Sequence, residues 1–242
     1  MTTLVVGASG ATGRLLVEQL LQRGHAVRII VRSTAGLPEA VVNHAKLSVI
    51  QASVLDLGDA ELVQHVSGCD AVASCLGHNL SFAGVFGPPH RLVTDATRRL
   101  CQAIKASRPE RPVKYVLMNT TGNRNRDLDE PISLGQKIVI LLLRLLLPPH
   151  VDNEQAAEYL RTVIGPDDGV VEWVAVRPDD LIDQGEVSEY SVHPSPIRSA
   201  IFDSGKTSRI NVGHFMAELI ADGDLWGEWR GRMPVIYNQE LG

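Results

Sequence analysis

Leu4-Val5-Val6-Gly7-Ala8-Ser9-Gly10-Ala11-Thr12-Gly13 leads from a short apolar run into a loop with glycines at positions 7, 10 and 13. Apolar residues at helical spacing follow, so the stretch predicts a strand, a tight turn and a helix. The first glycine permits a sharp reversal, the second lets backbone approach a pyrophosphate, and the third lets the helix pack on the strand. The first helical turn also attracts phosphate. We therefore expect a dinucleotide loop in which the pyrophosphate is held by Gly7, Ser9, Gly10, Ala11, Thr12 and Gly13.

The composition is that of an ordinary globular chain. The 242 residues are 44% hydrophobic and 21% charged, which fits one domain over residues 1–242. A net charge of −5 argues against a nucleic-acid surface or a strongly acidic membrane face. The three cysteines are odd in number and lack C-x-x-C spacing, and the histidines are scattered. Neither a disulfide framework nor a metal site is therefore expected.

The sequence shows no candidate targeting or spanning segment. Met1-Thr2-Thr3 leads directly into the first strand, which leaves no room for a secretory leader. The most hydrophobic stretch, 138–147, contains Arg144 and is too short to cross a bilayer. We therefore expect a cytoplasmic protein without a membrane span.

Apolar runs alternate with helical patterns along most of the chain. Continuous apolar strands separated by helices are typical of a parallel sheet that is covered on both faces. Right-handed crossovers then give a doubly wound, Rossmann-type α/β/α fold, with ligands outside the carboxyl ends of the strands. The strands that follow the first are predicted at 26–31, 47–51, 71–76, 113–118 and 171–176, with an edge strand near 189–193 and a last strand near 233–237.

Two regions interrupt this alternation. Residues 123–150 look like an insertion that ends in the apolar stretch 138–147. An all-round apolar helix has to be buried, either in its own domain or against a homodimer or protein partner. Asp152 and Gln155 then form the pattern of a capping box for a helix to about residue 163. Residues 178–210 are rich in loops and predict a small C-terminal lobe on the substrate side.

The end of the second predicted strand indicates which dinucleotide binds. A fold specific for NAD places an acid there to accept from the ribose hydroxyls. Here Arg32 and Ser33 stand in its place, and Arg14 adds a second cation in the first helical turn. A guanidinium beside a hydroxyl suits a 2′-phosphate, because it donates charge-assisted hydrogen bonds. We therefore expect NADP(H) to be preferred over NAD(H), the alternative being two ordinary surface arginines.

The Gly7-x-x-Gly10-x-x-Gly13 spacing resembles that of atypical and extended short-chain dehydrogenase/reductases. Val174-Ala175-Val176-Arg177-Pro178 and Glu158-Tyr159-Leu160-Arg161 resemble a later strand and helix of that group. The likeness is greatest to small reductases of the flavin reductase/biliverdin reductase B type and to nitrogen-repressor-like sensors. It implies adenine contacts from Ser53 and Val54. It also implies that the nicotinamide side is lined by Leu76, Gly77, Asn119, Thr120 and Thr121, with Arg177 and Pro178 as the far wall.

The proton relay usual in that superfamily is missing. Its acid is the tyrosine of Tyr-x-x-x-Lys, and no tyrosine here has a lysine four residues later. Asn153 replaces the lysine that many atypical relatives keep. The remaining candidates for polar contacts at the reaction centre are Thr120 and Thr121, which could equally satisfy nearby backbone, and His78, which could be a solvated loop histidine.

Two functions of different classes follow from these observations. The first is an NADP(H)-dependent oxidoreductase that transfers hydride to a small conjugated acceptor, such as a flavin, quinone or carbonyl compound, without the Tyr-x-x-x-Lys relay. The second is a non-catalytic NADP(H)-binding redox sensor or assembly factor acting through a protein partner. A nucleotide-sugar epimerase is disfavoured, because that chemistry normally uses the absent tyrosine.

Overall fold

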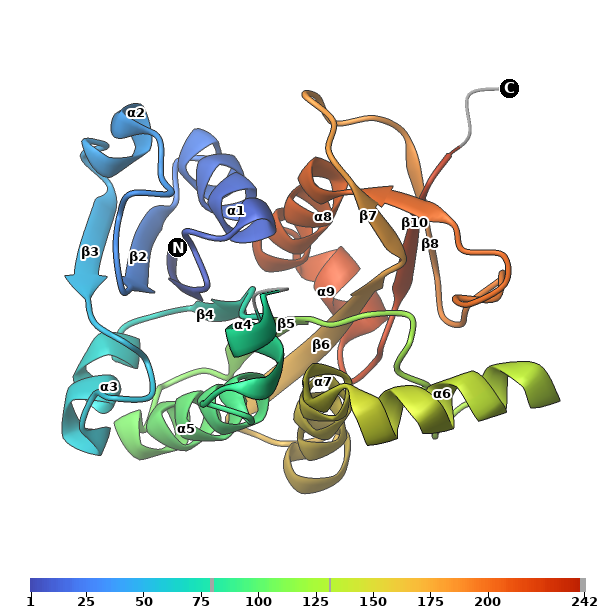
Figure 1. Cartoon of the computed structure of the whole chain (residues 1–242). Coiled ribbons are helices and arrows are strands. Elements are labelled where there is room, and N and C mark those ends of the chain that lie inside the picture. Colours follow the sequence, from blue (N-terminus) through green and yellow to red (C-terminus); the bar gives the residue numbers. More distant parts are fainter. Residues whose placement is uncertain (79–80, 131, 240–242) are drawn as a thin grey trace.

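An eight-stranded sheet forms the centre of the computed structural model, which describes residues 1–78, 81–130 and 132–239 (Figure 1). Seven neighbouring strands are parallel, and β8 pairs antiparallel with β10 at the edge. In spatial order the strands are β3 (Leu47–Gln51), β2 (Ala26–Val31), β1 (Thr2–Val6), β4 (Ala71–Ser74), β5 (Val113–Met118), β6 (Val171–Pro178), β10 (Val235–Asn238) and β8 (Tyr190–His193).

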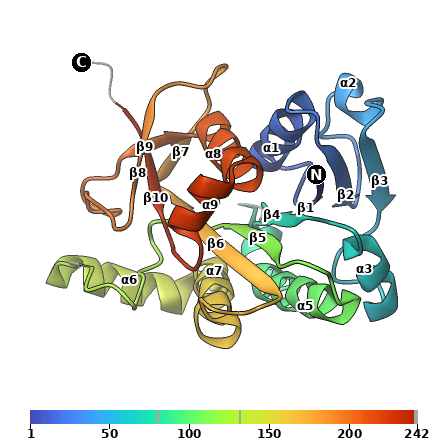
Figure 2. The same ribbon diagram turned by 180° about the vertical axis from the view of Figure 1, so that it is seen from behind.

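Helices cover both faces of this sheet (Figures 1 and 2). One layer holds α1 (Ala11–Gln22), α8 (Arg209–Ala221) and α9 (Gly223–Trp229), and the other holds α3 (Asp59–Val66), α5 (Leu92–Ser107) and α7 (Pro148–Tyr159). In β1 the side chain of Val5 packs into the first layer, while Leu4 and Val6 pack into the second. All three are fully buried, which explains why the strands read as continuous apolar runs.

Smaller elements lie at the ends of the sheet. The smaller elements are α2 (Glu39–Val42), α4 (Phe82–Phe86), α6 (Leu134–Leu146), the π-helical turn η1 (Leu160–Ile164), β7 (Asp180–Ile182) and β9 (Lys206–Ser208). Of these, β7 and β9 form a short parallel pair apart from the main sheet, and this pair forms part of the C-terminal lobe together with the edge strand β8.

The predicted three-layer, doubly wound fold is confirmed, and two local expectations are corrected. The helix predicted from a cap at Asp152 begins at Pro148, because proline is favoured in the first helical turn. Asp152 therefore lies inside α7, where its carboxylate caps the neighbouring α5. The short α9, β7 and β9 carry no strong periodicity and are not predicted from the sequence.

No single helix among the described residues is long and apolar enough to cross a membrane. The helix α6 and the segment Pro148–Ile164 pass that test together, by length and composition only, and they are bent by 104°.

Candidate functional site

The glycine loop brings β1, α1 and the end of β4 into close contact. Gly7 adopts a φ of +73°, and a Cβ atom there would lie 2.5 Å from the carbonyl group of Cys75. A Cβ atom at Gly13 would lie 2.1 Å from the carbonyl oxygen of Gly7. Side chains are excluded at both positions by backbone atoms, which cannot move aside. The predicted strand–turn–helix geometry is therefore present.

The first turn of α1 presents free backbone donors. Its N-cap is Gly10, which has no side chain to accept from the helix, and the turn contains no acidic residue. Ala11 and Arg14 are exposed there, and Thr12 is buried against the body. Uncapped N–H groups together with the helix dipole create a local preference for an anion.

A cavity of about 270 Å³ opens at the carboxyl ends of β1 to β4, beside this turn. Its walls carry one cationic side chain, that of Arg32, and none of the described lining residues is acidic. The lining residues are Gly7, Ser9, Gly10, Ile30, Val31, Arg32, Ala52, Ser53, Val54, Cys75, Leu76, Gly77, Pro89 and Leu92.

Arg32 is exposed at the end of β2, and within the described parts of the chain its guanidinium has no hydrogen-bond or ion-pair partner. The same holds for the exposed Arg14. Ser33 is also exposed, and its hydroxyl accepts from the N–H of Ala35 at 3.2 Å. The edge of the cavity thus offers guanidinium donors that no protein acceptor uses.

Eight residues expected at the cofactor line this cavity together: Gly7, Ser9, Gly10, Arg32, Ser53, Val54, Leu76 and Gly77. Sequence reasoning missed other apolar residues of the wall, among them Cys75, Pro89 and Leu92. Cys75 directly follows β4, and burial raises its thiol pKa to about 12, so the group packs as a neutral side chain. Pro89 and Leu92 precede and begin α5, and no local signal marks them as pocket residues.

Arg177 does not line the cavity beside the glycine loop, although it is expected to shape the far wall of the pocket. Its side chain is fully buried, and its guanidinium pairs with Glu130 at 2.7 and 3.1 Å. The remaining donors go to the carbonyl oxygens of Met233, Asn123 and Pro194. All five N–H groups of the guanidinium are therefore used inside the protein.

Pro178, which follows Arg177 and is the last residue of β6, also has its polar group bonded within the protein. Its carbonyl oxygen accepts from the N–H of Thr121 at 3.0 Å. Pro178 does not line the cavity beside the glycine loop. It joins the ends of β5 and β6 on the substrate side.

The polar residues after β5 are also largely paired. Asn119 donates to the carbonyl oxygen of Asn153 at 3.0 Å and accepts from the N–H of Thr120. Thr121 donates its hydroxyl to Asp179 at 2.9 Å. Burial raises the pKa of this Asp179 carboxyl group. Thr120 accepts from the N–H of Gly122 at 3.2 Å, which leaves its own hydroxyl proton for another acceptor.

The side chain of His78 is only 5% exposed, although a solvated loop histidine is one expectation for it. Its Nε2 lies 2.8 Å from a carboxylate oxygen of Asp152, and its Nδ1 lies 3.2 Å from the carbonyl oxygen of Gly84. Asp152 also accepts from the N–H groups of Val93 and Thr94, at 2.8 and 2.9 Å. Both ring nitrogens thus face protein acceptors, so His78 joins α4, α5 and α7 and has no free donor for a ligand.

Three of the four tyrosines have contacts that set them apart from the missing proton relay. Tyr115 is fully buried in β5, where burial raises its pKa and its hydroxyl donates to Thr97. Tyr159 lies under the guanidinium of Arg98 at 5.5 Å. Tyr190 is 2.8 Å from a ring nitrogen of His214, on the far side of the sheet from α7.

Comparison with known proteins agrees with this geometry. A model of the family described as NAD(P)H-binding matches residues 7–223. The chain belongs to that family. This NAD(P)H-binding chain is 28% identical over 198 residues to an uncharacterised chloroplastic protein of Arabidopsis thaliana. The match covers 76% of this chain and 66% of the relative, so the chain spans just under two thirds of that protein's length.

Solved structures of similar fold come from several bacteria. A short-chain dehydrogenase/reductase of Veillonella parvula in complex with NADP is 15% identical, with a TM-score of 0.71 over 100% of this chain and 95% of that one. A Streptococcus pneumoniae protein named as a candidate NADH-flavin reductase is 18% identical, with a TM-score of 0.67 over 99% and 100%. At these identities the likeness concerns the fold, and it confirms the Rossmann-type architecture.

Proposed function

We propose that the chain is an NADP(H)-dependent oxidoreductase that transfers hydride to a small conjugated acceptor such as a flavin, a quinone or a carbonyl compound. The observation that carries the proposal is the cavity beside the glycine loop. Backbone N–H groups face it at one end, and Arg32, which has no partner among the described residues, stands at its edge. No described lining residue is acidic. Such a wall favours a ligand with several phosphates.

The residues in and beside the cavity can be assigned to successive parts of the nucleotide. The loop 7–13 would hold the pyrophosphate, because side chains are excluded there and α1 is uncapped. Arg32, Ser33 and Arg14 would hold the 2′-phosphate, and Ser53 with Val54 would contact the adenine. When bound, NADPH supplies the hydride; the chain binds it, orients it and shields it from water.

The acceptor would receive little acid assistance from the protein. Thr120 has the spare hydroxyl among the predicted reaction-centre residues, because Thr121 and His78 already face protein acceptors. A flavin or quinone reduced by hydride can take its proton from solvent, so the missing Tyr-x-x-x-Lys pair suits these acceptors better than an unactivated carbonyl.

A second function, an NADP(H)-binding redox sensor without turnover, is supported by a different observation. The polar residues that end β5 and β6 are paired with other groups of the protein, which leaves few polar groups for a substrate. In that function a partner protein would contact the surface of this chain and respond to whether NADP⁺ or NADPH is bound.

Titration of NADP⁺, NADPH, NAD⁺ and NADH tests the cofactor. For Arg32→Ala we expect the affinity for NADP(H) to fall about 10- to 100-fold, since charge-assisted hydrogen bonds to the 2′-phosphate are lost. NAD(H) binding should stay within about twofold. Arg111→Ala, an exposed arginine away from the cavity, is the matched control. If no dinucleotide binds, the proposal fails.

Turnover is then measured as NADPH oxidation with a free flavin and with a water-soluble quinone. Steady consumption of NADPH supports the oxidoreductase. Tight NADP(H) binding with no consumption for either acceptor contradicts it and favours the sensor.

A further inference from the structure

The outer face of α6 is a continuous apolar surface. Six aliphatic side chains of this helix are between 49% and 75% exposed. Only Ile140 of the helix is buried, so the helix rests on the body along a narrow line. The exposed side chains, which we name the α6 face, are Leu134, Ile138, Leu141, Leu142, Leu145 and Leu146.

Helical geometry gathers these side chains into one arc. At about 100° per residue, the α6 face spans an arc of about 140° around the helix axis. Lys137 and Arg144 lie together along one edge of the arc. Gly135 lies at the other edge, where a Cβ atom would be 3.4 Å from the ring of Phe202. That ring is 63% exposed and extends the apolar surface beyond the start of the helix.

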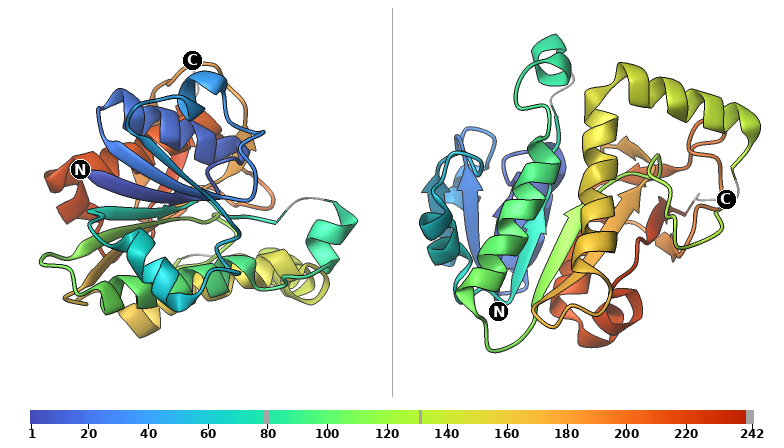
Figure 3. Two further views of the ribbon diagram at one scale, coloured as in Figure 1. Left: turned by 90° about the vertical axis from the view of Figure 1, so that its left-hand side faces the viewer. Right: turned by 90° about the horizontal axis from the view of Figure 1, so that it is seen from below.

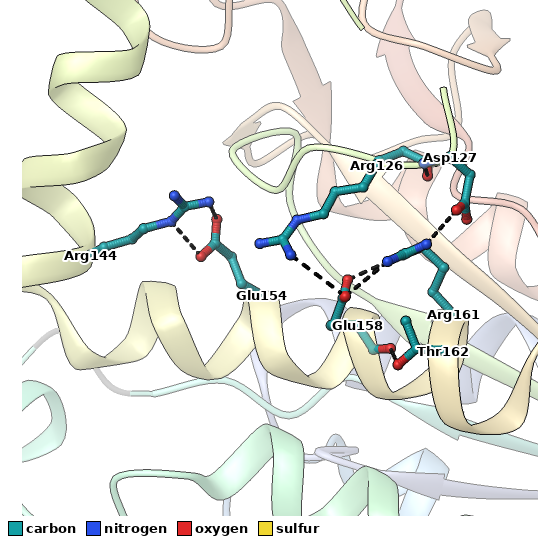
Figure 4. A network of polar contacts seen from close by, with 8 residues as sticks. Arg126, Asp127, Arg144, Glu154, Glu158, Arg161 and Thr162 are labelled. Carbon is teal, nitrogen blue, oxygen red and sulfur yellow. Dashed lines mark hydrogen bonds and ion pairs between the residues drawn. The ribbon is translucent and has the colours of Figure 1, made fainter. Parts of the chain in front are cut away.

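The charged residues of the α6 segment itself are both cationic, and the neighbouring Glu154 of α7 pairs with one of them. Residues 132–150 contain Lys137 and Arg144 and no acidic residue. Arg144 is held by Glu154 of α7 through two contacts of 2.8 Å (Figure 4). Lys137 is exposed, and within the described ranges its ammonium has no ion-pair partner.

From this arrangement we propose that α6 is an interfacial helix that seats the protein on an anionic lipid bilayer. A helix in the plane of a membrane buries a broad apolar face among the acyl chains and keeps basic residues at its edge, beside the headgroups. Both features are present, with Lys137 free to meet a lipid phosphate. The 13 residues of α6 are too few to span the bilayer, so the helix lies along its surface.

A bilayer covers this face better than a second copy of the chain does. A helix that pairs with one other helix needs a narrow apolar seam, whereas an arc of about 140° would remain partly exposed after such pairing. The face also consists of aliphatic residues alone, without the tyrosine, tryptophan or arginine anchors typical of the centre of a protein interface. A lipid phase needs no such anchors.

The position of α6 places the bilayer near the substrate side. α6 and α4 both project beyond the carboxyl ends of the strands (Figure 3). α4 carries Phe82 and Phe86, which are 82% and 46% exposed. A small cavity beneath α6 is lined by Ile140, Gln136 and Thr121, so the helix borders the predicted reaction centre. The inference goes beyond the proposed function and does not depend on the cofactor.

Flotation of the purified full chain with vesicles tests the inference. We use phosphatidylcholine vesicles with and without about 30% phosphatidylglycerol. The wild type should float with the anionic vesicles and should be released by high salt. Leu141→Gln combined with Leu145→Gln should lower the bound fraction at least about tenfold, and Lys137→Gln should lower it severalfold.

Val163→Gln is the matched control, because Val163 is 62% exposed on η1, away from α6, and its substitution should leave flotation unchanged. Thermal unfolding and the NADPH titration show separately that each variant is folded and binds nucleotide. The inference is overturned if the wild type stays unbound with both vesicle types, or if the double variant floats like the wild type. It is also overturned if the wild type forms a dimer that the double variant dissociates while vesicles bind neither.

Discussion

The two halves of the sheet differ in how the residues at the carboxyl ends of their strands use their hydrogen-bonding groups. Beside β1 to β4, the loop is backbone with few side chains, and Arg32 points at a cavity without a described protein partner. Beside β5 and β6, the polar side chains are numerous, yet most of them bind other groups of the protein. The guanidinium of Arg177 uses all five donors on protein acceptors, and Thr121 donates to Asp179.

This difference distinguishes residues that are available to bind a ligand from residues whose polar groups stabilise the fold. A polar group that spends its hydrogen bonds on the protein stabilises the fold and has little left for a ligand. A charged group that is left without a partner at the edge of a cavity indicates where a charged ligand binds. Residue type alone does not distinguish the two, because both halves carry an arginine at the end of a strand.

The largest effect is expected from Arg177→Met. The substitution leaves the buried Glu130 carboxylate without its partner and should lower the free energy of unfolding by about 3–5 kcal/mol. Urea unfolding measures the loss, and pairing the change with Glu130→Leu should recover part of it. NADPH affinity of the folded protein should stay unchanged. If the NADPH affinity fell while the free energy of unfolding stayed unchanged, Arg177 would instead belong to the binding site.

A smaller but still large effect is expected from Gly13→Ala, which tests the nucleotide half. The new Cβ atom would lie 2.1 Å from the carbonyl oxygen of Gly7, so we expect a loss of about 2–3 kcal/mol in unfolding free energy. NADPH binding should weaken with it, as measured by thermal unfolding with and without nucleotide. Gly223→Ala is the control, since apart from its chain neighbours and the backbone of its own helix no described atom lies within 4 Å of its Cβ position. Equal behaviour of the two variants would argue against a tight loop.

Thr120→Val and Thr121→Val form a matched pair on the substrate side. Thr121→Val removes a hydroxyl donor from the half-buried Asp179 and should cost about 1–2 kcal/mol of unfolding free energy. Thr120→Val should cost less stability and should instead slow NADPH oxidation about tenfold, with NADPH affinity unchanged. Urea unfolding and steady-state rates of both variants are compared. The reverse pattern would exchange the roles assigned to the two residues.

The smallest effect concerns the attachment of α6 to α7. Burial would raise the pKa of Glu154, but contacts with His150 and Arg144 outweigh it and lower that pKa to about 2. Because the folded pKa lies below the ordinary 4.5, the stabilisation is present above pH 4.5 and is lost as the pH falls toward 2. Glu154→Gln should cost about 1 kcal/mol at neutral pH. Urea unfolding from pH 7 downward should show this difference shrinking, and a constant difference would contradict the ion pair.

The α/β/α architecture and the glycine loop beside the cavity follow from local signals. Glycine spacing, strand hydrophobicity and the absence of an acid after 26–31 each lie within a few neighbouring residues. The same reasoning failed where partners come from distant parts of the chain. Asp152 reads as the start of its own helix, yet its carboxylate caps α5, about sixty positions earlier in the sequence.

By itself, therefore, the sequence determined the fold class, the glycine loop and an arginine suited to a 2′-phosphate. Backbone sterics and hydrophobic periodicity act between near neighbours, so they can be read from the order of the residues. Only the tertiary structure decided that Arg177 and His78 are occupied by protein, that Arg32 has no described partner, and that the apolar helix 134–146 turns six side chains outward. Hydrogen-bond partners and exposure depend on which distant segments meet, and that is fixed by packing.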